Sequence, residues 1–193
     1  MIAGVVLAAG LSRRMGRPKL LLDLDGRPVI RHAVEALAGA GVGELVVVVP
    51  PDSAALEAAL SGLAVRFAVN PRPEAGQSGS VVAGIGALSP TAEAVIIALG
   101  DQPDVPRAVL VGLREAHRAT GRPIVAPRYR EGRGNPVLFA AAVFPELLRL
   151  IGDQGARGVI DADPDRVALV PFDLPMPRDL DTPDDYESVR ARR

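Results

Sequence analysis

The chain has no cysteine, and histidine occurs only twice among its 193 residues. Without thiols there is no disulfide, no thiolate nucleophile and no zinc–thiolate site. His32 and His117 both fall in predicted helices among small apolar residues, where a structural role is the common one. A histidine-rich metal cage and a Ser-His-Asp triad are therefore not expected.

Net charge is also nearly absent, because 22 Lys plus Arg residues balance 23 Asp plus Glu residues. A formal charge of −1 provides no basic field for nucleic acid or for a membrane surface. No run approaches the roughly 18 apolar residues of a membrane span. The N-terminal run lacks the preceding basic residues of a signal peptide. We therefore expect a cytoplasmic protein without nucleic-acid or membrane partners.

Short apolar runs alternate with amphipathic stretches along most of the chain, and its length and its 48% hydrophobic content suit one domain over residues 1–193. This alternation predicts an α/β fold in which helices flank a mostly parallel central sheet. Ligands of such sheets collect beyond the carboxyl ends of the strands. Strands are predicted at 2–7, 44–49, 64–69, 94–99 and 166–170, and helices at 28–41, 52–60, 80–88, 106–120 and 144–150.

A polar, glycine-rich turn at residues 129–135 separates two further apolar runs, at 123–127 and 136–139. These runs predict a small β-hairpin flap that overhangs one end of the sheet. The three arginines of this hairpin could meet an anionic substrate, but solvated turn charges are the commoner case.

The loop at residues 7–19 directly follows the first predicted strand. Residues 8–10 have almost no side chain, so a bulky ligand could lie against their backbone. Four cations follow within seven residues, a pattern typical of polyphosphate binding, although a solvated basic turn also fits. Lys19 is the single lysine of the chain, and its compact ammonium is not interchangeable with a guanidinium at a phosphate. The four cations are Arg13, Arg14, Arg17 and Lys19.

Residues 70–80 form a second loop, with two prolines and two glycines, that leads into a predicted helix. Ser78 or Ser80 is expected to cap that helix. Loop donors at a helix N-terminus can bind an anion or the polar edge of a base, but a capped helix alone explains the pattern as well.

Carboxylates occur at two other informative places. Asp101 follows the buried strand 94–99, where it could hold a hard cation, whereas Asp104 suits a cap of the next helix. Near the C-terminus, Thr182 is expected to cap a helix that begins at the following proline. Asp179 and Asp181 lie outside that cap and point the same way on an extended segment.

The first loop resembles the LAAGxSxRMGxxK signature of the MobA-like nucleotidyltransferases. Residues 76–80 resemble the GxSxS segment of that family, residues 100–103 its GDQP motif, and residues 178–185 its D(I/L)DTPED motif. The motifs occur in the family's order and span nearly the whole chain. The signature is matched at Leu7, Ala8, Ala9, Gly10, Ser12, Arg14, Met15, Gly16 and Lys19.

The resemblance implies a Rossmann-like domain that transfers a nucleoside monophosphate from an NTP to an acceptor phosphate and releases pyrophosphate. Arg14, Lys19 and Asp101 are then the catalytic residues, and Asp101 and Asp181 bind Mg²⁺. No general base is required, because a phosphate acceptor is already ionised at neutral pH. The implied nucleotide-binding residues are Leu7, Ala8, Ala9, Gly10, Arg14, Lys19, Asn70, Gly76, Gln77, Ser78 and Ser80.

Residues 133–139 (RGNPVLF) and 152–157 (GDQGAR) resemble strings of the family's molybdenum cofactor branch. The nearest pattern is that of the molybdenum cofactor cytidylyltransferases, which implies CTP and molybdopterin as substrates and transient contact with a molybdenum enzyme or its chaperone. Ala9 favours CTP, because guanylyl-transferring relatives have glycine there. The implied acceptor-binding residues are Gln102, Asn135 and Arg157.

Two other interpretations stay open. A sugar-1-phosphate nucleotidyltransferase is disfavoured by the GDQGAR string. A non-catalytic nucleotide-binding or cofactor-insertion partner of a molybdenum enzyme is disfavoured because Lys19 and both metal carboxylates are present.

Overall fold

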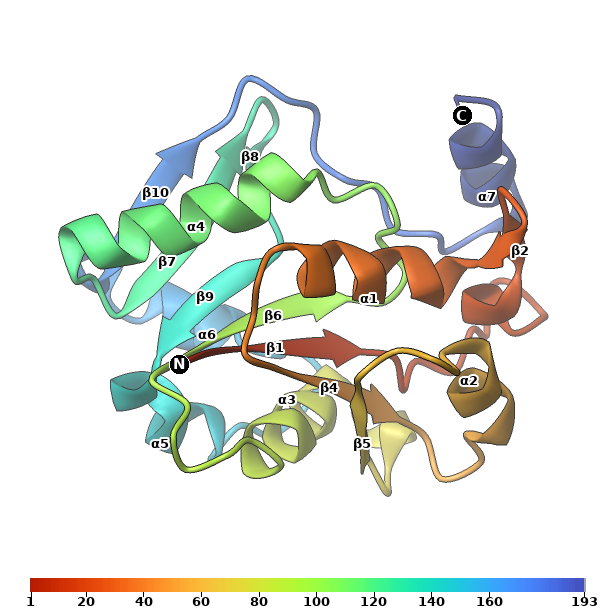
Figure 1. Ribbon diagram of the computed structural model, residues 1–193, viewed down its shortest axis with the longest axis horizontal. Helices are drawn as coiled ribbons and strands as arrows, with labels where there is room; N and C mark the ends of the chain where they lie inside the picture. Colours follow the sequence, from red (N-terminus) through yellow and green to blue (C-terminus); the bar gives the residue numbers. More distant parts are fainter. Residues whose placement is uncertain (193) are drawn as a thin grey trace.

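A computed structural model describes residues 1–192, so Arg193, the last residue of the predicted domain, lies outside the described part. An eight-stranded sheet forms its centre, in the order β10-β7-β9-β6-β1-β4-β5 with β8 paired to β7 (Figure 1). The strands are β1 (Ile2–Leu7), β4 (Glu44–Val49), β5 (Arg66–Val69), β6 (Ala94–Leu99), β7 (Ile124–Tyr129), β8 (Gly132–Arg133), β9 (Val137–Ala140) and β10 (Val167–Pro171).

The sheet is mostly parallel, as predicted. β1 pairs in parallel with β4 and β6, β4 with β5, and β10 with β7. β9 runs antiparallel to both of its neighbours, β6 and β7. The chain therefore forms a single α/β domain with a mostly parallel central sheet.

The predicted hairpin exists, but its two long strands are part of the main sheet. β9 lies between β6 and β7, and β8, at the tip of the hairpin, pairs with the end of β7. The reason is that β9 is apolar on both faces: Leu138 packs into one core cluster, whereas Val137 and Phe139 pack into the other. A strand that is apolar on both sides is more stable inside a sheet than in an exposed flap.

Helices cover both faces of the sheet, and each face has its own apolar core. Figure 1 shows α1 and α4 on one side, and α3 and α5 on the other. Alternation along β1 divides its side chains between the faces, with Val6 toward α1 and Val5 toward α3. The helices are α1 (Val29–Gly39), α2 (Ala54–Ala59), α3 (Gln77–Gly86), α4 (Arg107–Thr120), α5 (Phe144–Leu147), α6 (Arg157–Asp161) and α7 (Pro183–Arg190).

Shorter elements complete the described chain. Single 3-10 turns occur at η1 (Lys19–Leu21), η2 (Pro73–Ala75), η3 (Ala141–Val143) and η4 (Pro164–Arg166), and β2 (Asp23–Leu24) pairs with β3 (Arg27–Pro28). α4 begins later than a cap at Asp104 would place it, because Pro106 occupies its N-cap position. Within residues 1–192, no helix is long and apolar enough to cross a membrane.

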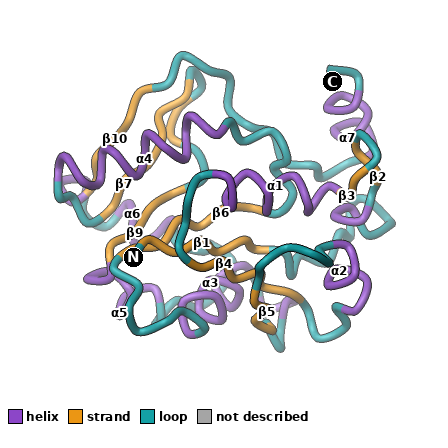
Figure 2. Tube along the Cα trace, in the orientation of Figure 1, coloured by secondary structure: helices purple, strands orange, loops and turns teal. Residues whose placement is uncertain are grey.

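The loops that follow β1, β4 and β6 lie on the same side of the sheet (Figure 2). This arrangement follows from the parallel pairing, which aligns the carboxyl ends of these strands. The segment after β10 returns to the same region before it enters α7 (Figure 1). The candidate site residues are therefore brought together from distant parts of the sequence.

Candidate active site

The first and third of the motif loops meet where β1 and β6 end. Leu7 and Leu99 are register partners, and Gly100 donates its N–H to the carbonyl oxygen of Leu7 at 2.9 Å. A Cβ at Gly100 would lie 3.0 Å from that oxygen and 2.8 Å from Cδ1 of Ile30. The absence of a side chain at Gly100 therefore allows the two loops to touch, so that Asp101 lies beside the first loop.

Ser12 organises the first loop. Its carbonyl oxygen accepts from the backbone N–H groups of Met15 and Gly16, at 3.1 and 3.2 Å. Its hydroxyl oxygen accepts from the backbone N–H of Lys19 at 3.3 Å. Ser12 adopts a φ of +50°, a conformation that is uncommon outside glycine and that clusters at ligand-binding sites. The loop is thereby held in the curve that directs Lys19 inward.

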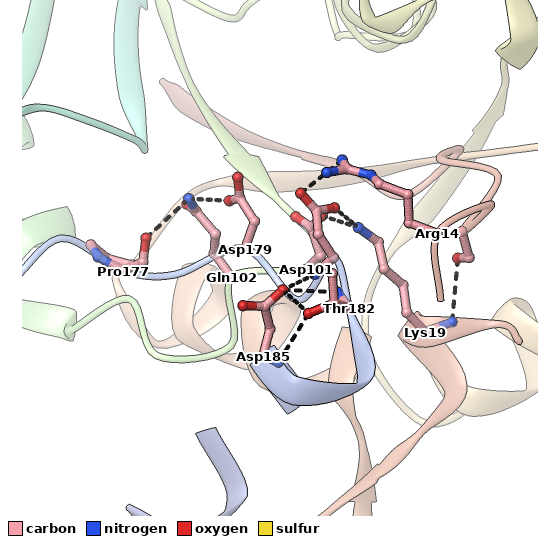
Figure 3. A network of polar contacts seen from close by, with 10 residues as sticks. Arg14, Lys19, Asp101, Gln102, Pro177, Asp179, Thr182 and Asp185 are labelled. Carbon is pink, nitrogen blue, oxygen red and sulfur yellow. Dashed lines mark hydrogen bonds and ion pairs between the residues drawn. The ribbon is translucent and has the colours of Figure 1, made fainter. Parts of the chain in front are cut away.

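Lys19 connects the two carboxylates that the sequence nominates as metal ligands. Its Nζ donates to Oδ2 of Asp101 at 2.5 Å and to Oδ1 of Asp181 at 2.9 Å (Figure 3). Arg14 reaches the other oxygen of Asp181 with its Nη2, at 2.8 Å. The side chain of Lys19 is only 10% exposed, whereas that of Arg14 is 72% exposed. The structure thus brings together all four residues to which catalysis and metal binding were assigned.

Lys19 keeps its charge in this position. Burial by itself would lower the pKa of its ammonium, but the charge and the hydrogen bonds of Asp101 and Asp181 outweigh burial and raise the pKa above its ordinary value. A permanently charged ammonium at the strand ends can stabilise the negative charge of phosphate oxygens.

Asp181 reaches this group because the segment between β10 and α7, residues 172–182, folds back onto the end of β6. We call this segment the strap. Leu180 donates its N–H to the carbonyl oxygen of Asp101 at 3.1 Å. Beyond it, Thr182 caps α7 as predicted, and with Asp185 it forms a capping box: the Thr182 hydroxyl oxygen accepts from Asp185 N–H, and the Asp185 carboxylate accepts from Thr182 N–H.

Asp101 and Asp181 fit a hard divalent cation. Within residues 1–192, no group of three or more Asp, Glu, His or Cys side chains could hold a metal ion alone. Mg²⁺ does not need such a group, because one or two carboxylates, substrate phosphates and water complete its coordination. Both carboxylates are partly exposed, and both are bound by the Lys19 ammonium. Their oxygens are suitable donors for a metal ion that binds together with a nucleotide.

A cleft of about 300 Å³ opens in front of this group. Its walls come from the ends of β1 and β6, the start of α3 and the strap. A Cβ at Gly10 would meet nothing within 4 Å, so the backbone there is open to a ligand. Of the residues assigned to the nucleotide or the metal, those that line the cleft are Leu7, Ala9, Gly10, Arg14, Lys19, Gly76, Gln77, Ser80, Asp101 and Asp181.

Three further residues assigned to the nucleotide lie outside that lining. Ala8 is buried and lines a different cavity, which shares Gly10 and Leu20 with the cleft. Asn70 is buried, where its Nδ2 donates to the Ser80 hydroxyl oxygen at 3.0 Å and its Oδ1 accepts from Arg72 N–H. Ser78 is buried and donates its hydroxyl to the carbonyl oxygen of Ile151 at 3.2 Å. Asn70 and Ser78 therefore hold neighbouring segments of the cleft wall in place and do not line the cleft themselves.

The expectation that Ser78 or Ser80 caps the helix is wrong. α3 begins at Gln77, its N-cap is Gly76, and no side chain caps it. Both serines lie within the first turn and make the contacts described above. The φ of +109° at Gly76 explains the difference, because this backbone conformation favours glycine at the point where the loop enters the helix.

The start of α3 interlocks with the turn at residues 151–157, which contains the GDQGAR string. The Ser78 N–H donates to the carbonyl oxygen of Gly152 at 3.2 Å. A Cβ at Gly76 would lie 2.5 Å from Cα of Asp153, and a Cβ at Gly155 would overlap Oε1 of Gln77. Two motifs that are far apart in sequence therefore form one unit, which sequence patterns alone did not reveal.

A second cavity, of about 120 Å³, lies beside the cleft and shares Leu7, Gln77 and Leu99 with it. Apolar side chains of β6, β9, α3 and α6 line part of the cavity, and polar groups line the rest. Its polar side chains are Gln77, Arg133, Asn135, Gln154 and Arg157.

Two of the three residues assigned to the acceptor, Asn135 and Arg157, line this second cavity, and Gln102 does not. Gln102 is only 4% exposed, and its Nε2 donates to Oδ1 of Asp179 at 2.7 Å. Arg133 and Gln154 were not among the assigned residues. Arg133 lies in the RGNPVLF motif and Gln154 in the GDQGAR motif, so these motifs could have identified them from the sequence.

The chain is similar to known proteins over most of its length. Residues 4–169 match the family model described as a MobA-like NTP transferase domain. Nicotine blue oxidoreductase of Paenarthrobacter nicotinovorans is 32% identical over 177 residues, which cover 88% of this chain and 86% of that protein. A 2-C-methyl-D-erythritol 4-phosphate cytidylyltransferase of Streptomyces avermitilis is 38% identical over 133 residues, or 65% of this chain and 52% of that protein.

Among solved structures, a manganese complex of Rv0371C from Mycobacterium tuberculosis H37Rv superposes with a TM-score of 0.87. The two proteins are 30% identical, and the match covers 100% of this chain and 99% of the other. The similarity therefore includes the C-terminal strap and α7, beyond the residues that the family model covers.

Proposed function

Because the chain belongs to the MobA-like NTP transferase family, we propose that it transfers CMP from CTP to the phosphate of molybdopterin and releases pyrophosphate. The observation that carries the proposal is the convergence of Lys19 and Arg14 with Asp101 and Asp181 at one end of the nucleotide-sized cleft. Cations and oxygen ligands placed together beside an open glycine loop suit phosphoryl chemistry better than redox or nucleophilic side-chain chemistry.

In this reaction an oxygen of the acceptor phosphate attacks the α-phosphorus of the nucleotide. The bond from that phosphorus to the β-phosphate oxygen breaks in line, and pyrophosphate leaves with the electron pair. Lys19 and Arg14 bind the β- and γ-phosphates and stabilise the charge that accumulates on the leaving group. A divalent cation held by Asp101 and Asp181 would polarise the α-phosphate. We propose Mg²⁺ for this position.

The shared wall of the two cavities supports the assignment of the acceptor side. Since Leu7, Gln77 and Leu99 border both cavities, a phosphate in the second cavity lies close to the cleft in which the nucleotide binds. Arg133 and Arg157 provide positive charge there, and the apolar remainder suits a ring system. Molybdopterin is proposed because both strings of the molybdenum cofactor branch line this cavity. Transient contact with the molybdenum enzyme or chaperone that receives the product belongs to the same proposal.

CTP is proposed on two grounds. Ala9 lines the nucleotide cleft, and a relative that matches over 133 residues is named as a cytidylyltransferase. Guanine presents a different donor–acceptor pattern and a larger ring, so it would leave buried polar groups unpaired at about 1–3 kcal/mol each. Two such mismatches correspond to a preference on the order of a hundredfold or more.

Pyrophosphate release tests the proposal. The enzyme is supplied with Mg²⁺ and with CTP, GTP or ATP at equal concentration, and each nucleotide is tested with molybdopterin, with a sugar 1-phosphate and without an acceptor. Turnover with CTP that requires molybdopterin is the expected result. A preference for GTP would reassign the nucleotide, and turnover only with a sugar 1-phosphate would reassign the acceptor. Binding of nucleotide without turnover on any acceptor would favour a non-catalytic partner of a molybdenum enzyme.

A further inference from the structure

Gln102 connects the end of β6 to the strap. It follows Asp101 directly and is 96% buried, since only 4% of it is exposed. Its Nε2 donates to Oδ1 of Asp179 at 2.7 Å and, more weakly, to the carbonyl oxygen of Pro177 at 3.4 Å (Figure 3). The side chain of Leu180, between the two aspartates, is fully buried. The strap is therefore attached at residues 177, 179 and 180, immediately before Asp181.

These contacts determine where Asp181 lies relative to Asp101. The two carboxylates belong to segments 80 positions apart, and Asp181 itself contacts Arg14 and Lys19 through its carboxylate and Asp185 through its backbone N–H. Its position therefore depends on the backbone bond from Leu180 to Asp101 and on the Gln102–Asp179 hydrogen bond. A metal site needs its ligands held to within about half an ångström, so a loose strap would separate the pair.

The chemistry of the Gln102–Asp179 contact supports a specific role for it. Gln102 is the buried member of this pair, whereas Asp179, which supplies the carboxylate, borders the cleft, and a buried amide is unfavourable unless its polar atoms are hydrogen-bonded. The amide of Gln102 satisfies this carboxylate, while its own Oε1 is buried without a hydrogen-bond partner within the described residues. An apolar side chain would fill the same space without an unsatisfied carbonyl, but it could not fix the direction of the strap.

We propose that Gln102 and Asp179 are positioning residues that set the geometry of the Asp101–Asp181 metal pair. The inference rests on the proposed nucleotidyltransferase function and extends it to Gln102, which lies outside the cleft lining, and to Asp179, which borders the cleft. Groups that orient metal ligands in this way typically change metal affinity by about 10- to 100-fold when they are replaced.

Two variants separate positioning from charge. Gln102→Met keeps the length of the side chain and removes the hydrogen bond. Asp179→Asn removes the charge but keeps an oxygen that can accept from Gln102. Glu131→Gln is the matched control, because Glu131 accepts from Met176 N–H on the same strap, five residues before Asp181. Mn²⁺ binding in the presence of CTP and without acceptor is measured by the electron paramagnetic resonance signal of free Mn²⁺, and folding is checked by thermal unfolding.

We expect Gln102→Met to weaken Mn²⁺ binding about 10-fold or more, and Asp179→Asn and Glu131→Gln to stay within about threefold of the parent protein. Wild-type Mn²⁺ affinity in folded Gln102→Met would overturn the inference, as would an equal loss in Asp179→Asn, which would assign the effect to charge. If the parent protein itself showed no Mn²⁺ binding that depends on Asp101, the proposed function would fail, and this inference with it.

Discussion

Replacement of Gly76 by alanine tests the interlock between α3 and the turn at residues 151–157. Gly76 has φ +109° and ψ 177°, a region that is essentially restricted to glycine, and another residue there is strained by about 1–3 kcal/mol. The new methyl would also lie 2.5 Å from Cα of Asp153 and 2.6 Å from the carbonyl oxygen of Gly152. These are backbone atoms, so the turn itself must move, and such overpacking costs about 1–3 kcal/mol more.

The two effects together predict a loss of about 2–6 kcal/mol in the free energy of unfolding, a large fraction of the roughly 5–15 kcal/mol of a typical domain. Gly62→Ala is the matched control. Gly62 also has a positive φ, of +81°, but a Cβ there would meet nothing within 4 Å. It therefore carries only the backbone strain, about 1–2 kcal/mol.

Urea unfolding followed by circular dichroism measures both variants, since the chain has no tryptophan for fluorescence. At a constant m value, the midpoint should fall more for Gly76→Ala than for Gly62→Ala. CTP binding should also weaken in Gly76→Ala alone, because Gln77 and Ser80 follow the displaced residue. Equal loss of stability in the two variants would refute the interlock.

Three other outcomes follow from the site. Asp101→Asn should stay folded and lose on the order of 100-fold or more in kcat, because a metal supplies several kcal/mol of transition-state stabilisation; wild-type pyrophosphate release would remove Asp101 from the mechanism. Lys19→Arg keeps the charge but not the compact shape, and should lower kcat about a hundredfold, the order that a 1 Å misplacement costs; identical kinetics would contradict this. The hydrogen bonds of Thr182 lower the pKa of Asp185 in the folded state. The capping box should therefore stabilise the fold at pH values above the unfolded pKa of Asp185, and this stabilisation should be lost as the pH falls through the lower pKa of the folded state. Thr182→Ala should accordingly cost about 0.5–2 kcal/mol in urea unfolding at pH 7, and less at pH 3; an equal cost at both pH values would disprove the link.

Local patterns in the sequence were sufficient to predict much of this architecture. Strands such as 94–99 are uniformly apolar, and a parallel sheet places the residue after each strand at the same edge, so Asp101 could be assigned to the site. The helix cap at Thr182 could likewise be predicted from four consecutive residues.

Other features depend on contacts that no local pattern encodes. Gly76 could be identified as a loop glycine, but not as the residue on which Asp153 packs. Gln102 follows Asp101, a proposed metal ligand, in a motif, which suggested a substrate contact, whereas its burial depends on the distant strap. The placement of β9 inside the sheet was missed because a hairpin and an inserted strand share the same pattern of apolar runs.

The strap also orders events during synthesis of the chain. Every strand of the main sheet lies at or before Pro171, so a nascent chain that has reached this residue already contains the complete sheet. It then has Lys19 and Asp101, but Asp181 has not yet been translated. Asp181 is therefore translated after every strand of the sheet, and a chain that stops early contains the first loop without the second of the two carboxylates proposed to bind the metal.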